Sequence, residues 1–128
     1  MTKVLPKSVK TIVIGGGVVG CSVAYHLAKF GWKDTILLER DQLTSGTTWH
    51  AAGLVSQLCP SAAITKIRKY TLDLYKELEK EVDHSAGLRL NGALSIAQNK
   101  GRWQELQRQA TTAQLYDVDV RILDKEQI

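Results

Sequence analysis

Three consecutive glycines that follow a short apolar run restrict the possible folds of this chain more strongly than its other features do. Residues Thr11–Ile14 are β-branched and uncharged, which predicts a buried strand of a parallel sheet with both faces covered. The next six residues fit the pattern G-x-G-x-x-G through Gly15, Gly17 and Gly20. A glycine turn between a strand and a helix is typical of a dinucleotide-binding unit, but the pattern alone is a weak signal.

The residues around this turn supply the expected context. Apolar residues recur at helical spacing from Val19 to Phe30, and Gly31 stands where helices commonly end. Thr35–Glu39 is again apolar and ends in an acid, which predicts a second strand. The first forty residues therefore predict a strand, helix and parallel strand in that order.

Each residue of the motif has a physical task in such a unit. Gly15 permits the tight turn, Gly17 removes a side chain that would block a pyrophosphate, and Gly20 lets the helix lie close to the sheet. The helix that begins near Val18 and Val19 directs its free N–H groups and roughly half a positive charge at the phosphates.

An acidic residue ends the second predicted strand. Glu39 is placed to accept hydrogen bonds from a ribose diol, and its charge would repel a 2′-phosphate, which disfavours NADP. We expect Arg40 to lie near the adenine. These residues do not distinguish FAD from NAD.

A loop rich in hydroxyl groups and glycine follows, over residues 44–53. Its small residues can approach a flexible dinucleotide, and its hydroxyl groups can bond the oxygens of that molecule. A nicotinamide-binding domain rarely needs such a loop there, so the loop favours FAD. His50 is its one strong nitrogen nucleophile, and the residues alone leave two roles open for it, attachment of a cofactor or an ordinary hydrogen bond beside Trp49.

The remainder of the chain predicts alternating helices and short strands. Ser61 begins an amphipathic helix that ends at Gly87, Trp103–Ala113 belongs to another helix, and Val118–Ile122 alternates like a half-buried strand. Leu88–Ala97 contains an Asn-Gly pair between alternating apolar residues, which predicts antiparallel pairing. The helix face expected to be buried consists of Ile64, Ile67, Thr71, Leu74, Leu78 and Val82.

We therefore expect an α/β fold with a Rossmann-like βαβ dinucleotide-binding unit, followed by helices and short strands. Residues 1–58 hold the βαβ unit and the flavin loop, and residues 59–128 hold a helix, short strands, a helix and a strand that leads onward. Asp124 and Gln127 form a helix-start signature just before the last residue. For that reason we expect residues 1–128 to be the N-terminal part of a larger FAD-binding domain, and the native product to be several-fold longer.

Composition excludes other classes of protein. The net charge of +4 is spread thinly, which argues against nucleic acid as a partner. Cys21 and Cys59 lack the spacing of a metal site or a disulfide framework, so we expect two buried thiols, no metal and a reducing compartment. Glycines interrupt the uncharged run from Thr11 to Ala28, which excludes a signal peptide and a membrane span there.

Three motifs carry a resemblance to a known family: T-I-V-I-G-G-G at Thr11–Gly17, the pair Glu39 and Arg40, and S-G-T-T-W-H-A-A-G-L at Ser45–Leu54. Together they resemble the N-terminus of the sarcosine and dimethylglycine dehydrogenases, FAD-dependent enzymes of the broader glycine oxidase or D-amino-acid oxidase class. The resemblance implies a covalent bond from the imidazole of His50 to the 8α carbon of the flavin. The cofactor-binding residues predicted from the motifs and the resemblance are Gly15, Gly17, Val18, Val19, Gly20, Glu39, Arg40, Ser45, Gly46, Thr47, Thr48, Trp49, His50, Ala51, Ala52, Gly53 and Leu54.

The resemblance also implies a reaction, the oxidative demethylation of an N-methyl amino acid such as sarcosine or dimethylglycine. A hydride equivalent passes to flavin N5, and the resulting iminium is hydrolysed to formaldehyde or trapped by tetrahydrofolate. The family has its substrate pocket and folate domain further along the chain, so no catalytic residue or electron acceptor is assigned, and we expect residues 1–128 alone to be inactive. We expect a cytoplasmic location, or the mitochondrial matrix in a eukaryote.

Two alternatives belong to other functional classes. One is a deaminating amino-acid oxidase with non-covalent FAD, in which His50 has no assigned task. The other is a non-catalytic regulatory homologue, as in the phosphatase regulatory subunit related to these dehydrogenases. The presence of Trp49 and His50 argues against the regulatory alternative.

Overall fold

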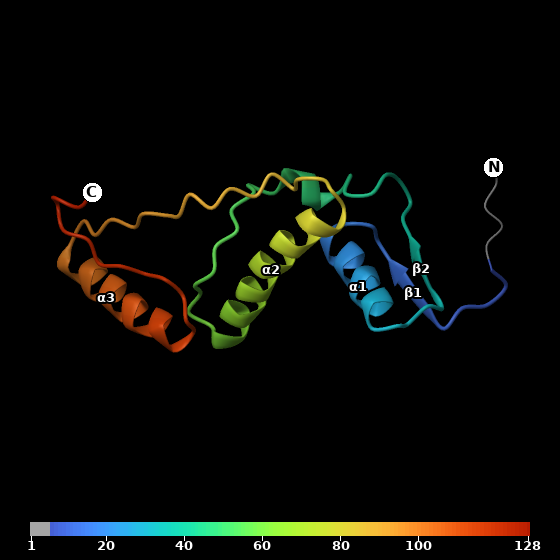
Figure 1. Cartoon of the computed structure of the whole chain (residues 1–128), viewed down its shortest axis with the longest axis horizontal. Helices are drawn as coiled ribbons and strands as arrows, with labels where there is room; N and C mark the ends of the chain where they lie inside the picture. The colour runs from blue at the N-terminus through green and yellow to red at the C-terminus, as the bar shows by residue number, and fades with distance from the viewer. Residues whose placement is uncertain (1–5) are drawn as a thin grey trace. The chain divides into compact units, whose positions relative to one another are not determined.

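The computed structural model describes residues 6–128, which belong to two compact units, residues 1–54 and residues 55–128. Across the described residues the chain is a small α/β structure with a two-stranded parallel sheet and three α-helices (Figure 1). The α/β class is thus confirmed, and the larger Rossmann-like sheet remains a prediction. In chain order the elements are β1 (Thr11–Ile14), α1 (Val18–Lys29), β2 (Thr35–Leu38), the 3-10 helix η1 (Thr47–His50), α2 (Ala62–Glu81) and α3 (Lys100–Leu115).

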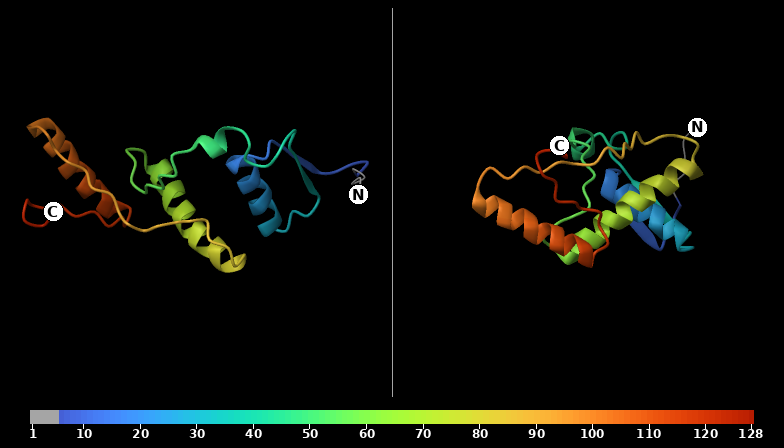
Figure 2. Two further views of the ribbon diagram at one scale, coloured as in Figure 1. Left: turned by 90° about the horizontal axis from the view of Figure 1, so that it is seen from above. Right: turned by 60° about the vertical axis from the view of Figure 1, so that its left-hand side comes forward.

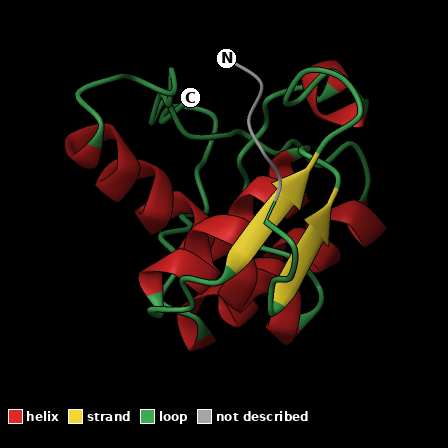
Figure 3. Ribbon diagram, turned by 90° about the vertical axis from the view of Figure 1, so that its right-hand side faces the viewer, coloured by secondary structure: helices red, strands yellow, loops and turns green. Residues whose placement is uncertain are grey.

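The sheet of the first unit joins β1 to β2 in parallel (Figure 3). The register pairs Thr11 with Thr35 at one end and Ile14 with Leu38 at the other. The Gly15 N–H extends the ladder by donating to the Leu38 carbonyl at 2.8 Å. With α1 as the crossover, the predicted order of strand, helix and parallel strand is confirmed.

Helix α1 ends where the sequence predicts, through a left-handed glycine. Gly31 has φ +81°, and its N–H donates to the Ala28 carbonyl at 2.9 Å. The Trp32 N–H donates to the Leu27 carbonyl at 2.8 Å. This pair of bonds is a Schellman motif, which satisfies two carbonyl groups that the last turn of a helix would otherwise leave unpaired.

At its other end, α1 packs directly against the backbone that follows β1. A Cβ atom at Gly20 would collide with the carbonyl oxygen of Gly15 and would lie 3.5 Å from Val13 Cγ1. Because the first obstacle is backbone, no side-chain movement could relieve the collision. Gly15 itself has φ +99°, a conformation that favours glycine, and this allows the chain to turn out of β1.

The prediction that both faces of β1 would be covered is wrong within the described residues. Val13 faces α1, whereas Ile12 and Ile14 point to the opposite face and are 53% and 85% exposed. The reason is that α1 is the element that packs on β1 and β2 in this unit, and one helix covers one face.

In the second unit, α2 differs from the prediction in its end and in its buried face. It ends at Glu81 and not at Gly87, because Asp83 already takes the left-handed conformation with φ +48°. Thr65 and Leu72 are its buried residues, whereas Ile67 of the predicted face is 64% exposed.

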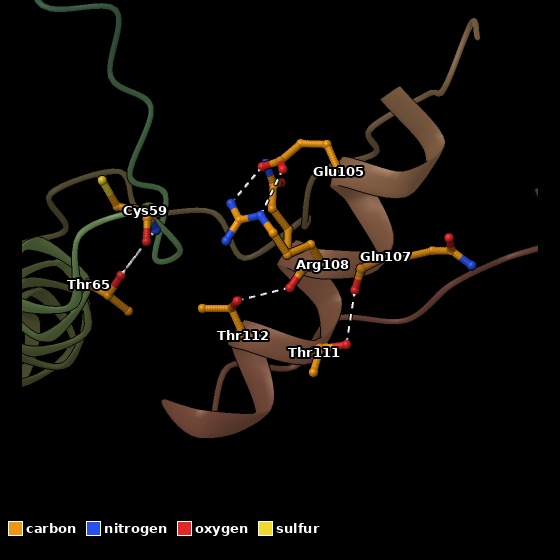
Figure 4. Close-up of polar contacts among 8 residues, drawn as sticks. Cys59, Thr65, Glu105, Gln107, Arg108, Thr111 and Thr112 are labelled. Carbon is orange, nitrogen blue, oxygen red and sulfur yellow. Dashed lines mark hydrogen bonds and ion pairs between the residues drawn. The ribbon is translucent and has the colours of Figure 1, made fainter. Parts of the chain in front are cut away.

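Thr65 explains which side of α2 is buried. Its hydroxyl group accepts a hydrogen bond from the Cys59 N–H at 3.1 Å and donates to the Cys59 carbonyl at 2.9 Å (Figure 4). These two bonds hold the segment before α2 against the Thr65 side of the helix. The cysteine itself is half-buried, as is Cys21, so the expectation of two buried thiols is met only in part.

Helix α3 is held by polar contacts at both ends of its sequence. The Asn99 side chain caps the N-terminus by accepting from the Arg102 N–H at 2.8 Å. Lys69 of α2 donates to the Tyr116 and Asp117 carbonyls just after the C-terminus, where a cation is favoured by the helix dipole.

The two segments predicted as strands, Leu88–Ala97 and Val118–Ile122, contain no strand. Figure 2 shows the chain between α2 and α3 as an extended connection without arrows. A strand requires a hydrogen-bonded neighbour, and these segments form no ladder with any other segment of residues 6–128. Their alternating apolar side chains remain outward, as for Leu90 and Ile96.

The predicted helix-start signature near residue 124 is present as a pair of reciprocal bonds. The Gln127 N–H donates to Asp124 Oδ1 at 3.1 Å, and the Asp124 N–H donates to Gln127 Oε1 at 3.0 Å. This arrangement is a capping box. Over residues 6–128, no helix has both the length and the apolar character that crossing a bilayer would require.

The contact at Gly20 generates a stability prediction. Gly20→Ala should lower the free energy of unfolding by about 3 kcal/mol or more, because the added methyl group meets an immovable carbonyl group. Gly101→Ala in α3 is the matched control, since its Cβ would make only an ordinary 3.5 Å contact with Asn99 and alanine favours helices. Denaturant titration of both variants measures the difference, and equal stabilities would contradict the packing described here.

Candidate functional site

In the first unit, hydrogen bonds of the Gly16 peptide groups connect the glycine turn to the end of β2 and to the following loop. The Gly16 N–H donates to Glu39 Oε2 at 2.6 Å, and the Gly16 carbonyl accepts from the Thr44 N–H at 2.9 Å. Gly16 is the buried residue of the glycine run. The G-x-G-x-x-G pattern leaves this position unspecified, so the sequence alone does not mark Gly16 as a site residue.

Glu39 lies at the carboxyl end of β2 with a carboxylate that is held by backbone donors. Besides the Gly16 bond, Oε1 accepts from the Arg40 N–H at 2.7 Å and from the Asp41 N–H at 3.1 Å. These bonds favour the charged form, so the pKa of Glu39 is lowered, first by Gly16 and then by Asp41; partial burial opposes them, and Arg40 adds a smaller lowering effect. A carboxylate offers about four acceptor sites, so capacity remains for a ligand hydroxyl group.

Thr48 of η1 lies at the N-terminus of α1. Its Oγ1 accepts from the Val18 N–H at 2.9 Å, and a Cβ atom at Gly17 would lie 3.0 Å from the same oxygen. Because Oγ1 accepts from Val18, its own proton can be donated to another oxygen atom. Helix geometry also leaves the N–H groups of Val19 and Gly20 without an intrahelical acceptor. The N-terminus of α1 thus offers several donors to an anion.

The last residues of η1 are an aromatic pair. The rings of Trp49 and His50 have centroids 4.0 Å apart and planes inclined by 37°. Trp49 is 67% exposed. His50 Nδ1 lies 3.3 Å from the Gly46 carbonyl oxygen. Since a carbonyl group only accepts, this contact requires the proton on Nδ1 and leaves the lone pair on Nε2.

The structure brings some predicted site residues together and leaves others apart. Gly17, Val18 and Thr48 meet at the start of α1, while Glu39 reaches the same turn through Gly16. The Arg40 side chain is exposed. Within the described residues, the other predicted loop residues form no side-chain hydrogen bond to the glycine turn, the start of α1 or Glu39. They are Ser45, Thr47, Ala51, Ala52, Gly53 and Leu54.

This donor set fits a dinucleotide. The free N–H groups at the start of α1 suit a pyrophosphate, and the remaining acceptor capacity of Glu39 suits a ribose hydroxyl group. Gly17 carries no side chain where the backbone must approach the phosphates. Both features lie at the carboxyl ends of parallel strands, where open α/β sheets bind ligands.

Comparison with known proteins assigns the class. Residues 10–128 match the family described as FAD dependent oxidoreductase. The chain therefore belongs to the FAD-dependent oxidoreductase family.

Three relatives illustrate what the family includes. The chain is 47% identical over 102 residues to the 4-methylaminobutanoate oxidase (formaldehyde-forming) of Paenarthrobacter nicotinovorans, covering 80% of the chain and 12% of that enzyme. It is 43% identical over 120 residues to human mitochondrial sarcosine dehydrogenase, covering 93% and 13%. It is 40% identical over 119 residues to rat mitochondrial dimethylglycine dehydrogenase, covering 93% and 14%. By their names these relatives are an oxidase and two dehydrogenases of N-methyl amino acids, and the chain spans about one eighth of their length.

The bonds to Glu39 generate a prediction of pH dependence. A carboxyl group with a lowered folded pKa adds stability that is present above its unfolded pKa and is lost as the pH falls through the folded value. We expect the wild-type protein to be more stable than Glu39→Gln at neutral pH, and the difference to disappear in acid below the ordinary range of a glutamate. Unfolding free energies of the two proteins across this pH range provide the measurement. A difference in stability that stays constant with pH would contradict the claim that the backbone donors favour the charged form of Glu39.

Proposed function

We propose that this chain supplies the FAD-binding segment of an enzyme that oxidatively demethylates an N-methyl amino acid such as sarcosine or dimethylglycine. The observation that carries the proposal is the convergence of Glu39 and Thr48 on the two sides of the glycine turn. The similarity to three enzymes of N-methyl amino acids supports the substrate class. Tetrahydrofolate as acceptor of the one-carbon unit and a matrix location in a eukaryote remain predictions.

Different residues of the first unit bind different parts of FAD. The N–H groups of Val19 and Gly20 and the hydroxyl group of Thr48 hold the pyrophosphate, because all three can donate to it while the Val18 N–H donates to Thr48 Oγ1. The carboxylate of Glu39 accepts from the adenosine ribose, and its position is fixed by the backbone donors. When bound, FAD supplies the redox chemistry as acceptor of the hydride equivalent, and the chain binds and orients it.

His50 carries the flavin through a covalent bond from Nε2 to the 8α carbon of the isoalloxazine. The contact between Nδ1 and the Gly46 carbonyl supports this choice of nitrogen, because it engages Nδ1 as a donor and leaves the lone pair on Nε2. The stacked Trp49 ring limits rotation of the imidazole. A deaminating oxidase with non-covalent FAD is the second candidate, in which the same contact would only stabilise η1.

The role of Glu39 is tested in the full-length enzyme. Glu39→Ala should weaken FAD binding by about 10- to 100-fold, because a hydrogen bond to a charged group is lost and Gly16 loses its acceptor. Glu105→Ala is the control, since Glu105 is also a carboxylate with a lowered pKa, of about 2, but it pairs with Arg108 on α3 (Figure 4). FAD titration of the apoproteins measures both, and unchanged affinity of Glu39→Ala would count against the ribose assignment.

The role of His50 is tested by the fate of the flavin in acid. The full-length holoenzyme should give a yellow, fluorescent precipitate, and mass spectrometry should locate the modified peptide at His50. His50→Ala should release all its flavin to the supernatant. If the wild-type flavin is released as well, or if His50→Ala still retains flavin covalently, the attachment site is wrong and the second candidate gains support.

A further inference from the structure

We propose that Gly16, the position that the G-x-G-x-x-G pattern leaves open, is a positioning residue for the cofactor site. Its peptide groups set the ribose-binding carboxylate and the start of the loop that carries His50 relative to the same turn. This inference rests on the proposed function for the identity of what the site binds.

Both peptide groups of Gly16 form hydrogen bonds to segments further along the chain. Its N–H donates to Glu39 Oε2 at 2.6 Å, across 23 positions of sequence. Its carbonyl accepts from the Thr44 N–H at 2.9 Å and from Cys21 Sγ at 3.4 Å. One residue therefore connects the turn, the end of β2, the first turn of α1 and the loop.

The space around Gly16 also excludes a side chain. A Cβ atom there would overlap with Leu43 Cδ2 and would lie 3.2 Å from both Cβ and Oε2 of Glu39. The most severe obstacle is thus the end of a flexible side chain, and Leu43 directly precedes Thr44. Adding a methyl group must displace the end of the side chain of Leu43, the residue that directly precedes the loop, and it also presses on the Glu39 carboxylate.

A positioning role and an ordinary packing role for Gly16 predict different results. Glu39 serves the ADP half of the cofactor and the loop from Thr44 serves the flavin half, so a shift at Gly16 misaligns one half relative to the other. A packing defect alone would lower stability but would leave the covalent fraction of bound flavin unchanged. A positioning defect lowers FAD affinity and also the fraction of bound flavin that resists acid.

The experiment compares four variants of the full-length enzyme: Gly16→Ala, Leu43→Ala, the double variant, and Gly101→Ala as a control for a glycine-to-alanine change without tight contacts. FAD affinity is measured by titration of apoprotein, and the acid-stable fraction by precipitation. Gly16→Ala should bind FAD about tenfold more weakly and retain a smaller acid-stable fraction. The double variant should recover both properties, because the displaced side chain is gone, while Leu43→Ala and Gly101→Ala should resemble the wild type.

Several results would overturn the proposal. Wild-type FAD affinity and acid-stable fraction in Gly16→Ala would do so, as would a double variant that recovers neither. If Gly16→Ala fails to accumulate as folded protein, the double variant decides by the same two measurements. Failure of the proposed function is recognised separately in the wild type. If acid releases all of the wild-type flavin, the covalent bond is absent, but the comparison of FAD affinities still tests the role of Gly16.

Discussion

The hydrogen bond from the Gly16 N–H to the Glu39 carboxylate closes the βαβ unit at the edge where its site forms. It joins a residue of the turn after β1 to the residue that follows β2, and so connects the two strand ends beyond the ladder. The close packing of Gly20 on the Gly15 carbonyl brings the start of α1 to the same edge. Thr48 reaches the helix N-terminus at the same edge, where its Oγ1 accepts from the Val18 N–H at 2.9 Å.

A lowered pKa does not by itself distinguish this site from the rest of the chain. Glu105 also has a lowered pKa, but its oxygens are engaged by the Arg108 guanidinium on the same helix, and the two charges compensate each other. Glu39 is held by neutral backbone donors, principally Gly16, so its negative charge and part of its acceptor capacity stay available. Glu39 is therefore suited to a ribose diol because its hydrogen-bond donors are neutral, and the size of its pKa shift matters less.

Local signals explain which parts of the fold could be predicted from the sequence. The glycine turn, α1 and its Gly31 end depend on neighbouring residues, as does the reciprocal pair of Asp124 and Gln127. The strands expected at Leu88–Ala97 and Val118–Ile122 depend on distant partners, which alternation alone cannot supply. For the site, the motif residues were identifiable by type, whereas Gly16 acts through bonds to Glu39 and Thr44 that only the folded chain brings together.

The central claim is that FAD lies across the glycine turn, between Glu39 and Thr48. A crystal structure of the full-length holoenzyme tests it most directly. We expect pyrophosphate oxygens within hydrogen-bonding distance of the Val19 and Gly20 N–H groups and Thr48 Oγ1, with a ribose hydroxyl group on the Glu39 carboxylate. Electron density that places FAD away from this turn, or a ribose that does not contact Glu39, would contradict it.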